Sequence, residues 1–125
     1  MSILRLAYIG DSVWDMLVRT RLILEGKNLH HMHQEAVSRV NAAAQSRAFH
    51  VLDPVLSDEE RSFAMRGRNA HARHAAPKHQ DRVDYQEATG LEALMGFLYL
   101  TGQEDRLHEL FEYCCKEDSI CRKPQ

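Results

Sequence analysis

The sequence predicts an all-α domain of about five helices that forms a single unit over residues 1–125. Apolar residues recur at the spacing of three and four residues that is typical of helices, and no segment alternates between apolar and polar residues as a half-buried strand would. Gly26, Pro54 and Gly102 interrupt this pattern and mark where helices end. A chain of 125 residues is long enough to bury one core, so we expect no second domain.

Three helices are expected in the first half of the chain. The first spans residues 3–25 and ends at a glycine. After a loop at residues 27–31, a second helix carries apolar residues at helical spacing from Met32 toward about Leu52. Ser57 is expected to cap a short third helix that ends near Gly67, because three acids follow it where the helix dipole favours negative charge.

A basic loop and two further helices complete the predicted fold. Residues 68–80 lack apolar periodicity and are expected to form an exposed loop, and helices follow at residues 81–101 and from Glu104 through Cys114. The net charge is −2, yet residues 61–82 hold six Lys or Arg against a single acid. This distribution suits a phosphate-rich partner, although it also suits an ordinary solvated surface. The six are Arg61, Arg66, Arg68, Arg73, Lys78 and Arg82.

Two nearly apolar stretches each contain a carboxylate among hydrophobic residues. The stretch Leu4–Asp15 carries Asp11 in its middle and is apolar on almost every side, which is typical of a buried helix. The stretch Thr89–Leu100 contains one charge, Glu92, and the small residues near both acids would let another backbone approach. Because a carboxylate in such surroundings needs a positive partner, we expect the two helices to cross with Asp11 and Glu92 in contact.

A divalent cation is one partner that would satisfy both acids. Mg²⁺ prefers oxygen ligands and is commonly held by one or two carboxylates together with substrate phosphates. Held by Asp11 and Glu92, it would polarise a phosphodiester and generate an attacking hydroxide. Asp15 follows Asp11 by four residues on the same helical face and is a candidate for an outer-shell position. An internal arginine or a helix cap is the competing explanation for either acid.

The cysteines and the hydrophobic runs bear on the cellular compartment. Cys114, Cys115 and Cys121 form an odd number, which argues against a disulfide framework, and we expect reduced side chains buried on the last helix. No apolar run reaches the roughly 20 residues that span a bilayer. The N-terminus also lacks the pattern of a secretory signal, so a cytoplasmic protein with no membrane partner is expected.

Three segments carry a family resemblance. They are Ala7–Val13, Arg66–Ala70 and Ala88–Leu100, with the step Pro77–Lys78 between the last two. Their composition and order resemble the catalytic domain of the ribonuclease III family. They resemble more closely its Mini-ribonuclease III form, which lacks a double-stranded-RNA-binding domain. The matches span nearly the whole chain.

The resemblance implies a specific activity and specific residues. It implies a homodimer of helical ribonuclease III endonuclease domains that cleaves double-stranded RNA with Mg²⁺, or with Mn²⁺ as a substitute, and leaves 5′-phosphate and 3′-hydroxyl ends. The 23S ribosomal RNA precursor is the implied substrate, which leaves room for a ribosomal protein as a further partner. Asp11 and Glu92 match the catalytic metal ligands. The expected RNA contacts are Arg66, Arg68, Asn69, Arg73 and Lys78.

The chain also departs from the family pattern. Full-length ribonuclease III has a glutamate where Ala7 stands and an aspartate where Thr89 stands. Mini-ribonuclease III often has an arginine at the position of Gln86. The acidic set is therefore smaller, which leaves Asp15 as the one compensating candidate.

Two other functions remain open at this point. An all-α, Mg²⁺-dependent nucleotide pyrophosphohydrolase would also use acids on helices, and the spacing of Glu109 and Glu112 suits it, although an ordinary amphipathic helix explains that pair equally well. A non-catalytic RNA-binding and dimerisation module would keep the fold without hydrolysis. Turnover of free nucleotides or binding without cleavage would identify these alternatives.

Overall fold

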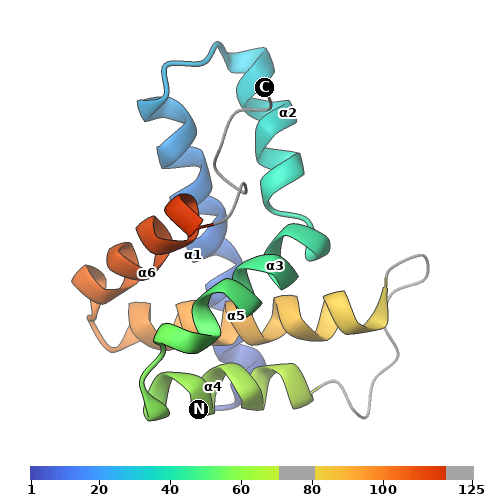
Figure 1. Ribbon diagram of the computed structural model, residues 1–125, viewed down its shortest axis with the longest axis vertical. Coiled ribbons are helices and arrows are strands. Elements are labelled where there is room, and N and C mark those ends of the chain that lie inside the picture. The colour runs from blue at the N-terminus through green and yellow to red at the C-terminus, as the bar shows by residue number, and fades with distance from the viewer. Residues whose placement is uncertain (71–80, 118–125) are drawn as a thin grey trace.

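The computed structural model describes residues 1–70 and 81–117 of the chain. That part contains six α-helices, one 3₁₀ turn (η1) and no strand, which confirms the all-α prediction (Figure 1). In chain order the elements are α1 (Ile3–Leu24), α2 (Leu29–Arg39), α3 (Ala42–Leu52), η1 (Asp53–Val55), α4 (Asp58–Asn69), α5 (Arg82–Leu100) and α6 (Glu104–Glu117).

Helix α5 is the centre of the fold. It runs across the middle of the molecule, and α1, α3 and α4 all pack against it (Figure 1). From Glu87 to Leu98 every residue except Glu92 is buried. Trp14 and Phe111 meet edge to face in the same core, with ring centroids 5.3 Å apart, so α1 and α6 also join the central helix. Helix α5 therefore carries Glu92 through the interior of the molecule.

Side-chain caps and glycines fix where the helices begin and end. The Ser57 hydroxyl accepts a hydrogen bond from the backbone N–H of Glu60, whose carboxylate accepts one from the backbone N–H of Ser57. This capping box confirms the predicted start of α4. Gly26 and Gly102 follow α1 and α5 with φ of 73° and 72°, a conformation that glycine adopts without strain.

The single helix predicted from Met32 to Leu52 is wrong, because two helices, α2 and α3, occupy that range. Val40 and Asn41 both leave the helical conformation between them. The Asn41 side-chain oxygen accepts a hydrogen bond from the backbone N–H of Ala44 at 2.9 Å and so caps α3. Apolar residues continue at helical spacing across this break, which concealed it in the sequence.

Helix α1 is buried on one side only, which corrects the expectation of a helix buried all round. Trp14 and Val18 are fully buried, whereas Tyr8 is 84% exposed and Met16 is 68% exposed. Asp11 lies among the exposed residues. Its charge therefore lies outside the core. Packing within the chain does not explain why the exposed side of α1 is hydrophobic.

Two ion-pair networks tie the outer helices to the rest. The buried Arg39 of α2 pairs with Glu25 (Nη1–Oε1, 3.2 Å) and Glu35 (Nη2–Oε2, 3.1 Å). The pKa of Glu35 is lowered chiefly by its hydrogen bond with Lys27, and Arg39 lowers it further. These contacts link the end of α1 to α2.

The second network joins α4 to α6. Arg106 donates to both carboxylate oxygens of Glu60 at 2.8 Å and to the Val55 carbonyl oxygen at 2.9 Å. The pKa of Glu60 is lowered chiefly by the hydrogen bond from Arg106. Glu60 thus serves twice, as part of the capping box and as the anchor of α6.

The predictions for the cysteines and for a membrane span can be examined in the described residues. Cys114 and Cys115 are buried in the core on α6, as expected, while Cys121 lies outside the described residues. No helix within residues 1–70 and 81–117 is both long enough and apolar enough to cross a bilayer.

Candidate active site

Helices α1 and α5 cross at a point where each contributes a glycine. A methyl group added to Gly10 would lie 1.6 Å from the backbone oxygen of Glu92, and one added to Gly96 would lie 2.0 Å from the backbone oxygen of Leu6. No side chain fits in either place, so the two backbones pack directly on each other. Asp11 follows Gly10 in the sequence and is therefore held at this crossing.

The crossing brings the two predicted acids together. The Asp11 side chain is exposed, the Glu92 side chain is half-buried, and the two carboxyl groups are within hydrogen-bonding distance. The pKa of Glu92 is raised to about 9, because burial disfavours its charged form and because the Asp11 carboxylate accepts a hydrogen bond from the protonated form and repels the ionised one. The two acids therefore interact directly, and at neutral pH the Glu92 carboxyl group is largely protonated.

No described Lys or Arg compensates these acids. Burial and Asp11 are the causes that shift the pKa of Glu92, and a basic side chain is not among them. Within residues 1–70 and 81–117, no group of three or more His, Cys, Asp or Glu side chains is arranged to hold a metal. The site therefore offers two facing carboxylates, which fits a hard divalent cation that takes its remaining ligands from water and substrate phosphates.

Asp15 already has a partner. One turn beyond Asp11 on α1, its carboxylate pairs with Arg19, with 3.1 Å between Nε and Oδ2. Both side chains are partly exposed, so this pair contributes little stability. Its effect is to orient the Asp15 carboxylate.

Ala7 and Thr89, the two positions where full-length ribonuclease III has acids, do not supply additional metal ligands. Ala7 is buried at 7% exposure beside the crossing. Thr89 is 5% exposed, and its hydroxyl donates a hydrogen bond to the Tyr85 carbonyl oxygen at 2.9 Å. That hydroxyl is engaged with its own helix, so the described acidic set consists of Asp11 and Glu92, with Asp15 nearby.

The last turn of α4 places basic residues beside the same segment of α5. A methyl group on Gly67 would meet the Ala93 side chain at 2.6 Å and the Thr89 backbone oxygen at 2.9 Å, so α4 touches α5 on both sides of Glu92 in the sequence. The residues around Gly67 are the predicted RNA contacts Arg66, which is exposed, Arg68, which is half-buried, and Asn69, which is exposed. The other two, Arg73 and Lys78, lie outside the described residues.

The acids that suited a pyrophosphohydrolase are engaged elsewhere. Glu109 pairs with Arg106, and Glu112 pairs with Arg21 at 2.6 Å between Nη1 and Oε1. Leu110 is buried between them. The segment is an amphipathic helix that faces the core on one side and forms ion pairs on the other.

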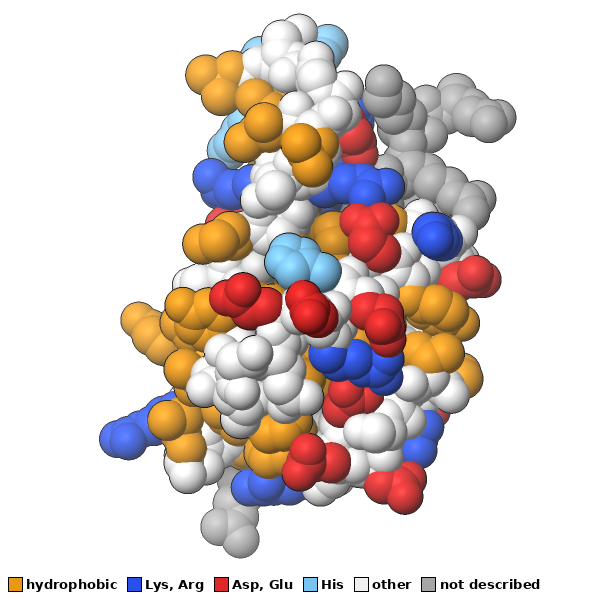
Figure 2. All heavy atoms as spheres, turned by 90° about the vertical axis from the view of Figure 1, so that its left-hand side faces the viewer, with side chains coloured by type: hydrophobic (Ala, Val, Ile, Leu, Met, Phe, Trp, Pro, Cys, Tyr) orange, Lys and Arg blue, Asp and Glu red, His pale blue; other side chains and the backbone are white. Residues whose placement is uncertain are grey.

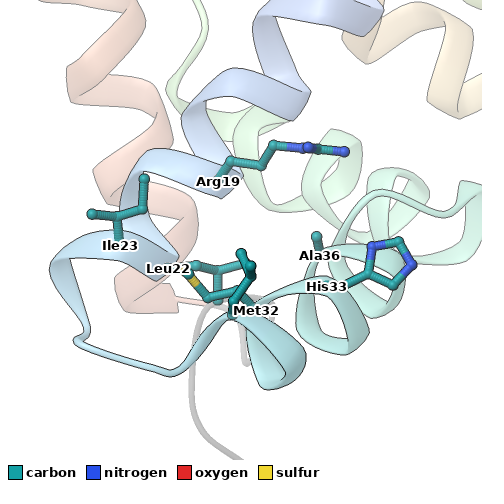
Figure 3. A pocket seen from close by; sticks show the side chains of 7 residues that line it. Arg19, Leu22, Ile23, Met32, His33 and Ala36 are labelled. Atoms are coloured by element: carbon teal, nitrogen blue, oxygen red, sulfur yellow. The ribbon is translucent and has the colours of Figure 1, made fainter.

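One apolar cavity lies away from the acids, since neither Asp11 nor Glu92 lines it. It has a volume of about 330 Å³ and lies between α1 and α2 (Figure 3). Its lining residues are Arg19, Leu22, Ile23, Leu29, Met32, His33 and Ala36. On the face that carries α6, acidic and basic side chains of the described residues are interspersed with hydrophobic ones, and these residues form no continuous basic surface there (Figure 2). Neither feature suits a polyanion.

The sequence pattern points to Ala7 and Gly96 as the small residues at the crossing and misses the role of Gly10. The available signal is its position directly before Asp11 inside an otherwise hydrophobic helix. A glycine in a helix interior is costly unless another backbone approaches it, so its presence there indicates a crossing.

Comparisons with known proteins give matches over most of the chain. The model of the ribonuclease III domain family matches residues 4–103. A Mini-ribonuclease 3 from Symbiobacterium thermophilum is 43% identical over 110 residues, which cover 87% of this chain and 84% of that protein. A Mini-ribonuclease 3 from Gloeobacter violaceus is 40% identical over 114 residues, covering 91% and 82%.

A solved structure has the same fold. The crystal structure of a protein from Fusobacterium nucleatum superposes with a TM-score of 0.82 at 28% sequence identity and covers 93% of each chain. Both the sequence and the arrangement of the helices are therefore similar to those of known proteins over most of the chain.

Proposed function

The chain belongs to the ribonuclease III domain family, and from this premise we propose that it cleaves double-stranded RNA at a Mg²⁺ site held by Asp11 and Glu92. It is an endoribonuclease of the ribonuclease III type. The observation that carries the proposal is the contact between two carboxylates from different helices, with no described basic side chain beside them. Acids held together in this way are suited to a cation.

The roles of the chain's own groups follow from their positions. The glycine crossing fixes the spacing of Asp11 and Glu92, so the ligands are positioned before substrate arrives. A bound Mg²⁺, or Mn²⁺ in its place, would polarise the phosphodiester and supply a nucleophile from water. Glu92 must lose its proton to become a ligand, so metal affinity rises with pH. The products carry 5′-phosphate and 3′-hydroxyl ends.

Asp15 is assigned an outer-shell position. It lies one helical turn from Asp11, and Arg19 holds its carboxylate. From there it would orient water around the site without replacing either ligand. It would thus compensate in part for the acids that Ala7 and Thr89 replace.

The basic segment is assigned to RNA binding. Arg66, Arg68 and Asn69 occupy the last turn of α4, which touches α5 around Glu92. Arg73 and Lys78 continue the same segment in the sequence. A-form RNA is recognised mainly through phosphates, 2′-hydroxyls and shape, which Arg, Lys and Asn side chains suit. Affinity for RNA should therefore fall steeply with salt, because bound counterions are released.

The active form is assigned as a homodimer that is formed through α1. Tyr8 is 84% exposed, and a cavity of about 250 Å³ lies along the same face of α1, lined there by Ile9, Ser12 and Met16. In a two-fold interface the same surface of both copies meets. A projecting side chain of each copy can therefore fill a hollow on the other. The exposed hydrophobic side of α1 would be covered in this way.

The dimer can be tested by one substitution on α1 and one control substitution on α2. Tyr8→Arg should shift the protein from dimer to monomer in analytical ultracentrifugation. Leu29→Arg is the matched control, because Leu29 is 79% exposed but lies on α2 and lines the other cavity. A Tyr8→Arg protein that remains dimeric would place the interface elsewhere.

The substrate follows from the family form that the chain resembles. We assign a 23S ribosomal RNA precursor, with a ribosomal protein as a further partner that presents it. Cleavage of a precursor with and without ribosomal proteins would test this assignment.

The experiment for the proposed function compares single acid variants on a long double-stranded RNA. Asp11→Asn and Glu92→Gln should fold and bind RNA but lose cleavage in Mg²⁺ by several orders of magnitude. Asp105→Asn, an exposed acid on α6, is the control and should cleave normally. Retained cleavage by either site variant would refute the assignment. Hydrolysis of free nucleotides would instead favour a pyrophosphohydrolase, and binding without cleavage by the unmodified protein would favour a non-catalytic module.

A further inference from the structure

An aromatic stack joins α4 to α5 close to the basic turn. The Phe63 and Phe97 rings lie nearly parallel, with centroids 3.9 Å apart and 13° between their planes. Phe97 is 9% exposed and belongs to the core, whereas Phe63 is half-buried and packs against the core. One face of the Phe63 ring is thus fixed by α5, and the position of the ring is set by the same helix that carries Glu92.

Arg66 lies over this ring. Its guanidinium carbon is 5.2 Å from the Phe63 centroid, within the roughly 6 Å that is typical of a cation–π contact. Two other arginines have carboxylate partners instead: Arg61 on the same helix bonds to Asp53, and Arg106 on α6 bonds to Glu60. Arg66 is held by an aromatic face while its side chain remains exposed.

The kind of contact determines what Arg66 can still bind. A guanidinium carries its five N–H donors around its edge, and stacking on a ring uses its flat face. A carboxylate partner would occupy those donors, but a ring leaves them available. A phosphate oxygen accepts such donors in pairs, which is the geometry that favours arginine over lysine. The contact with the ring therefore restrains the Arg66 side chain, and within the described residues no carboxylate forms an ion pair with it.

We propose that Phe63 is a positioning residue for RNA binding, which holds the Arg66 guanidinium ready for a backbone phosphate of the substrate. The proposal rests on the proposed function, since it assumes an RNA substrate. It deepens that function by naming the residue that fixes one phosphate contact relative to the acid pair. The relay runs from Phe97 on α5, through Phe63, to Arg66. Loss of the ring should free Arg66 to adopt other rotamers, so binding should weaken although the charge remains.

The test measures RNA affinity without divalent metal, and KM and kcat with Mg²⁺, for four variants and one control variant of the full chain. Phe63→Leu removes the ring but keeps an apolar side chain, and Phe63→Tyr keeps the ring. Arg66→Ala removes the charge, and the fourth variant combines Phe63→Leu with Arg66→Ala. Arg61→Ala is the matched control, because it removes the same charge from the same helix where the guanidinium is bound to Asp53.

If Phe63 positions Arg66, the variants should differ in RNA affinity in a specific way. Phe63→Leu and Arg66→Ala should each weaken RNA binding and raise KM roughly 3- to 10-fold, with kcat nearly unchanged, and the double variant should be no weaker than Arg66→Ala alone. Phe63→Tyr should restore affinity. Arg66→Ala should also lower the slope of log affinity against log salt by about one unit, and Arg61→Ala should affect affinity less than Arg66→Ala does.

Other results would overturn the proposal. Normal RNA affinity of Phe63→Leu beside weakened Arg66→Ala would overturn the positioning role and leave the proposed function intact. Additive losses in the double variant would show that Phe63 acts independently of Arg66 and would have the same consequence. If the unmodified protein did not bind double-stranded RNA, the proposed function and this inference would fail together. Thermal melting of Phe63→Leu distinguishes a lost contact from a lost fold.

Discussion

Acids occupy two opposite electrostatic settings in this molecule. Glu60 accepts hydrogen bonds from Arg106, and its pKa is lowered as a result. Glu92 faces Asp11, a second acid, and its pKa is raised to about 9. The first setting stabilises the folded chain at neutral pH, and the second costs stability there. Both occur on helices that pack against or belong to the central core.

The difference distinguishes an acid that stabilises the fold, Glu60, from an acid of the candidate site, Glu92. A buried ion pair that is fully hydrogen-bonded fixes one helix against another, as Arg39 and Arg106 do. Two acids held together by backbone packing have no such structural benefit, and acids with strongly shifted pKa values are typical of functional sites. The contrast can be tested by altering first the packing, then a charge in an ion pair, then Glu92 of the acid pair, and finally a polar group that belongs to neither setting.

The largest effect is expected at the packing that holds the acids together. Gly10→Ala should prevent or severely weaken folding, by more than about 3 kcal/mol, because the added methyl group overlaps the Glu92 backbone oxygen. Gly26→Ala is the control: it stands at φ 73° with nothing within 4 Å, so it should cost only about 1 kcal/mol. Urea denaturation followed by circular dichroism compares the two. Similar losses would show that the crossing is not closely packed.

The next effect is expected at a paired charge. Arg39→Met should lower the free energy of unfolding by about 3 kcal/mol, because Glu25 and Glu35 would lose their buried partner. Arg19→Met, which breaks the exposed pair with Asp15, should cost less than about 0.5 kcal/mol. Equal losses in urea denaturation would remove the distinction between buried and exposed pairs in this fold.

The sequence predicted the pairing of the acids better than it predicted their surroundings. Asp11 and Glu92 could be paired because each is a charge within an apolar helix, and small residues beside them indicated close backbones. Their burial could not be derived, because an exposed hydrophobic surface of a single chain has the same composition as a core. Tyr8, at 84% exposure, is an example. The hydrophobic residues of α1 thus include both core residues and exposed residues, which the sequence does not distinguish.

Glu92, which faces another acid, should behave in the opposite way to Glu60, which faces an arginine. Without metal, Glu92→Gln should raise the free energy of unfolding at pH 8 by about 1–2 kcal/mol, because the ionised carboxylate is disfavoured in the folded state. Since the pKa of Glu92 rises from 4.5 to about 9 on folding, its contribution is fully present below pH 4.5 and is lost as pH rises toward 9. The gain of Glu92→Gln over the unmodified chain should therefore grow with pH.

Glu60→Gln provides the control for this prediction. The folded-state pKa of Glu60 is lowered below 4.5, so its contribution is present above pH 4.5 and is lost only as pH falls through the lowered value. Glu60→Gln should thus destabilise the chain, with no change between pH 6 and pH 9. Thermal melts across that range measure both variants. A destabilised Glu92→Gln at pH 8 would mean that the acid pair is already compensated.

The break between α2 and α3 shows a different limit of sequence-based prediction. Asn41 is an N-cap that ends one helix and starts the next, but three alanines follow it and keep the helical pattern continuous. A cap is recognised from sequence when the apolar spacing also changes, as it does at Ser57. The relay from Phe97 to Arg66 is equally hidden, because it depends on how α4 packs against α5.

The smallest effect is expected at Thr89, whose polar group lies beside the acids but belongs to neither setting. Thr89→Val should cost less than about 1 kcal/mol, because the hydroxyl donates to the Tyr85 carbonyl oxygen within its own helix. Thr101→Val removes a similar bond, to the Phe97 carbonyl oxygen at 2.7 Å, and is the control. The Mg²⁺ concentration required for RNA cleavage should be the same in both variants. A higher requirement in Thr89→Val alone would add Thr89 to the metal site, and the site would then no longer depend on two carboxylates.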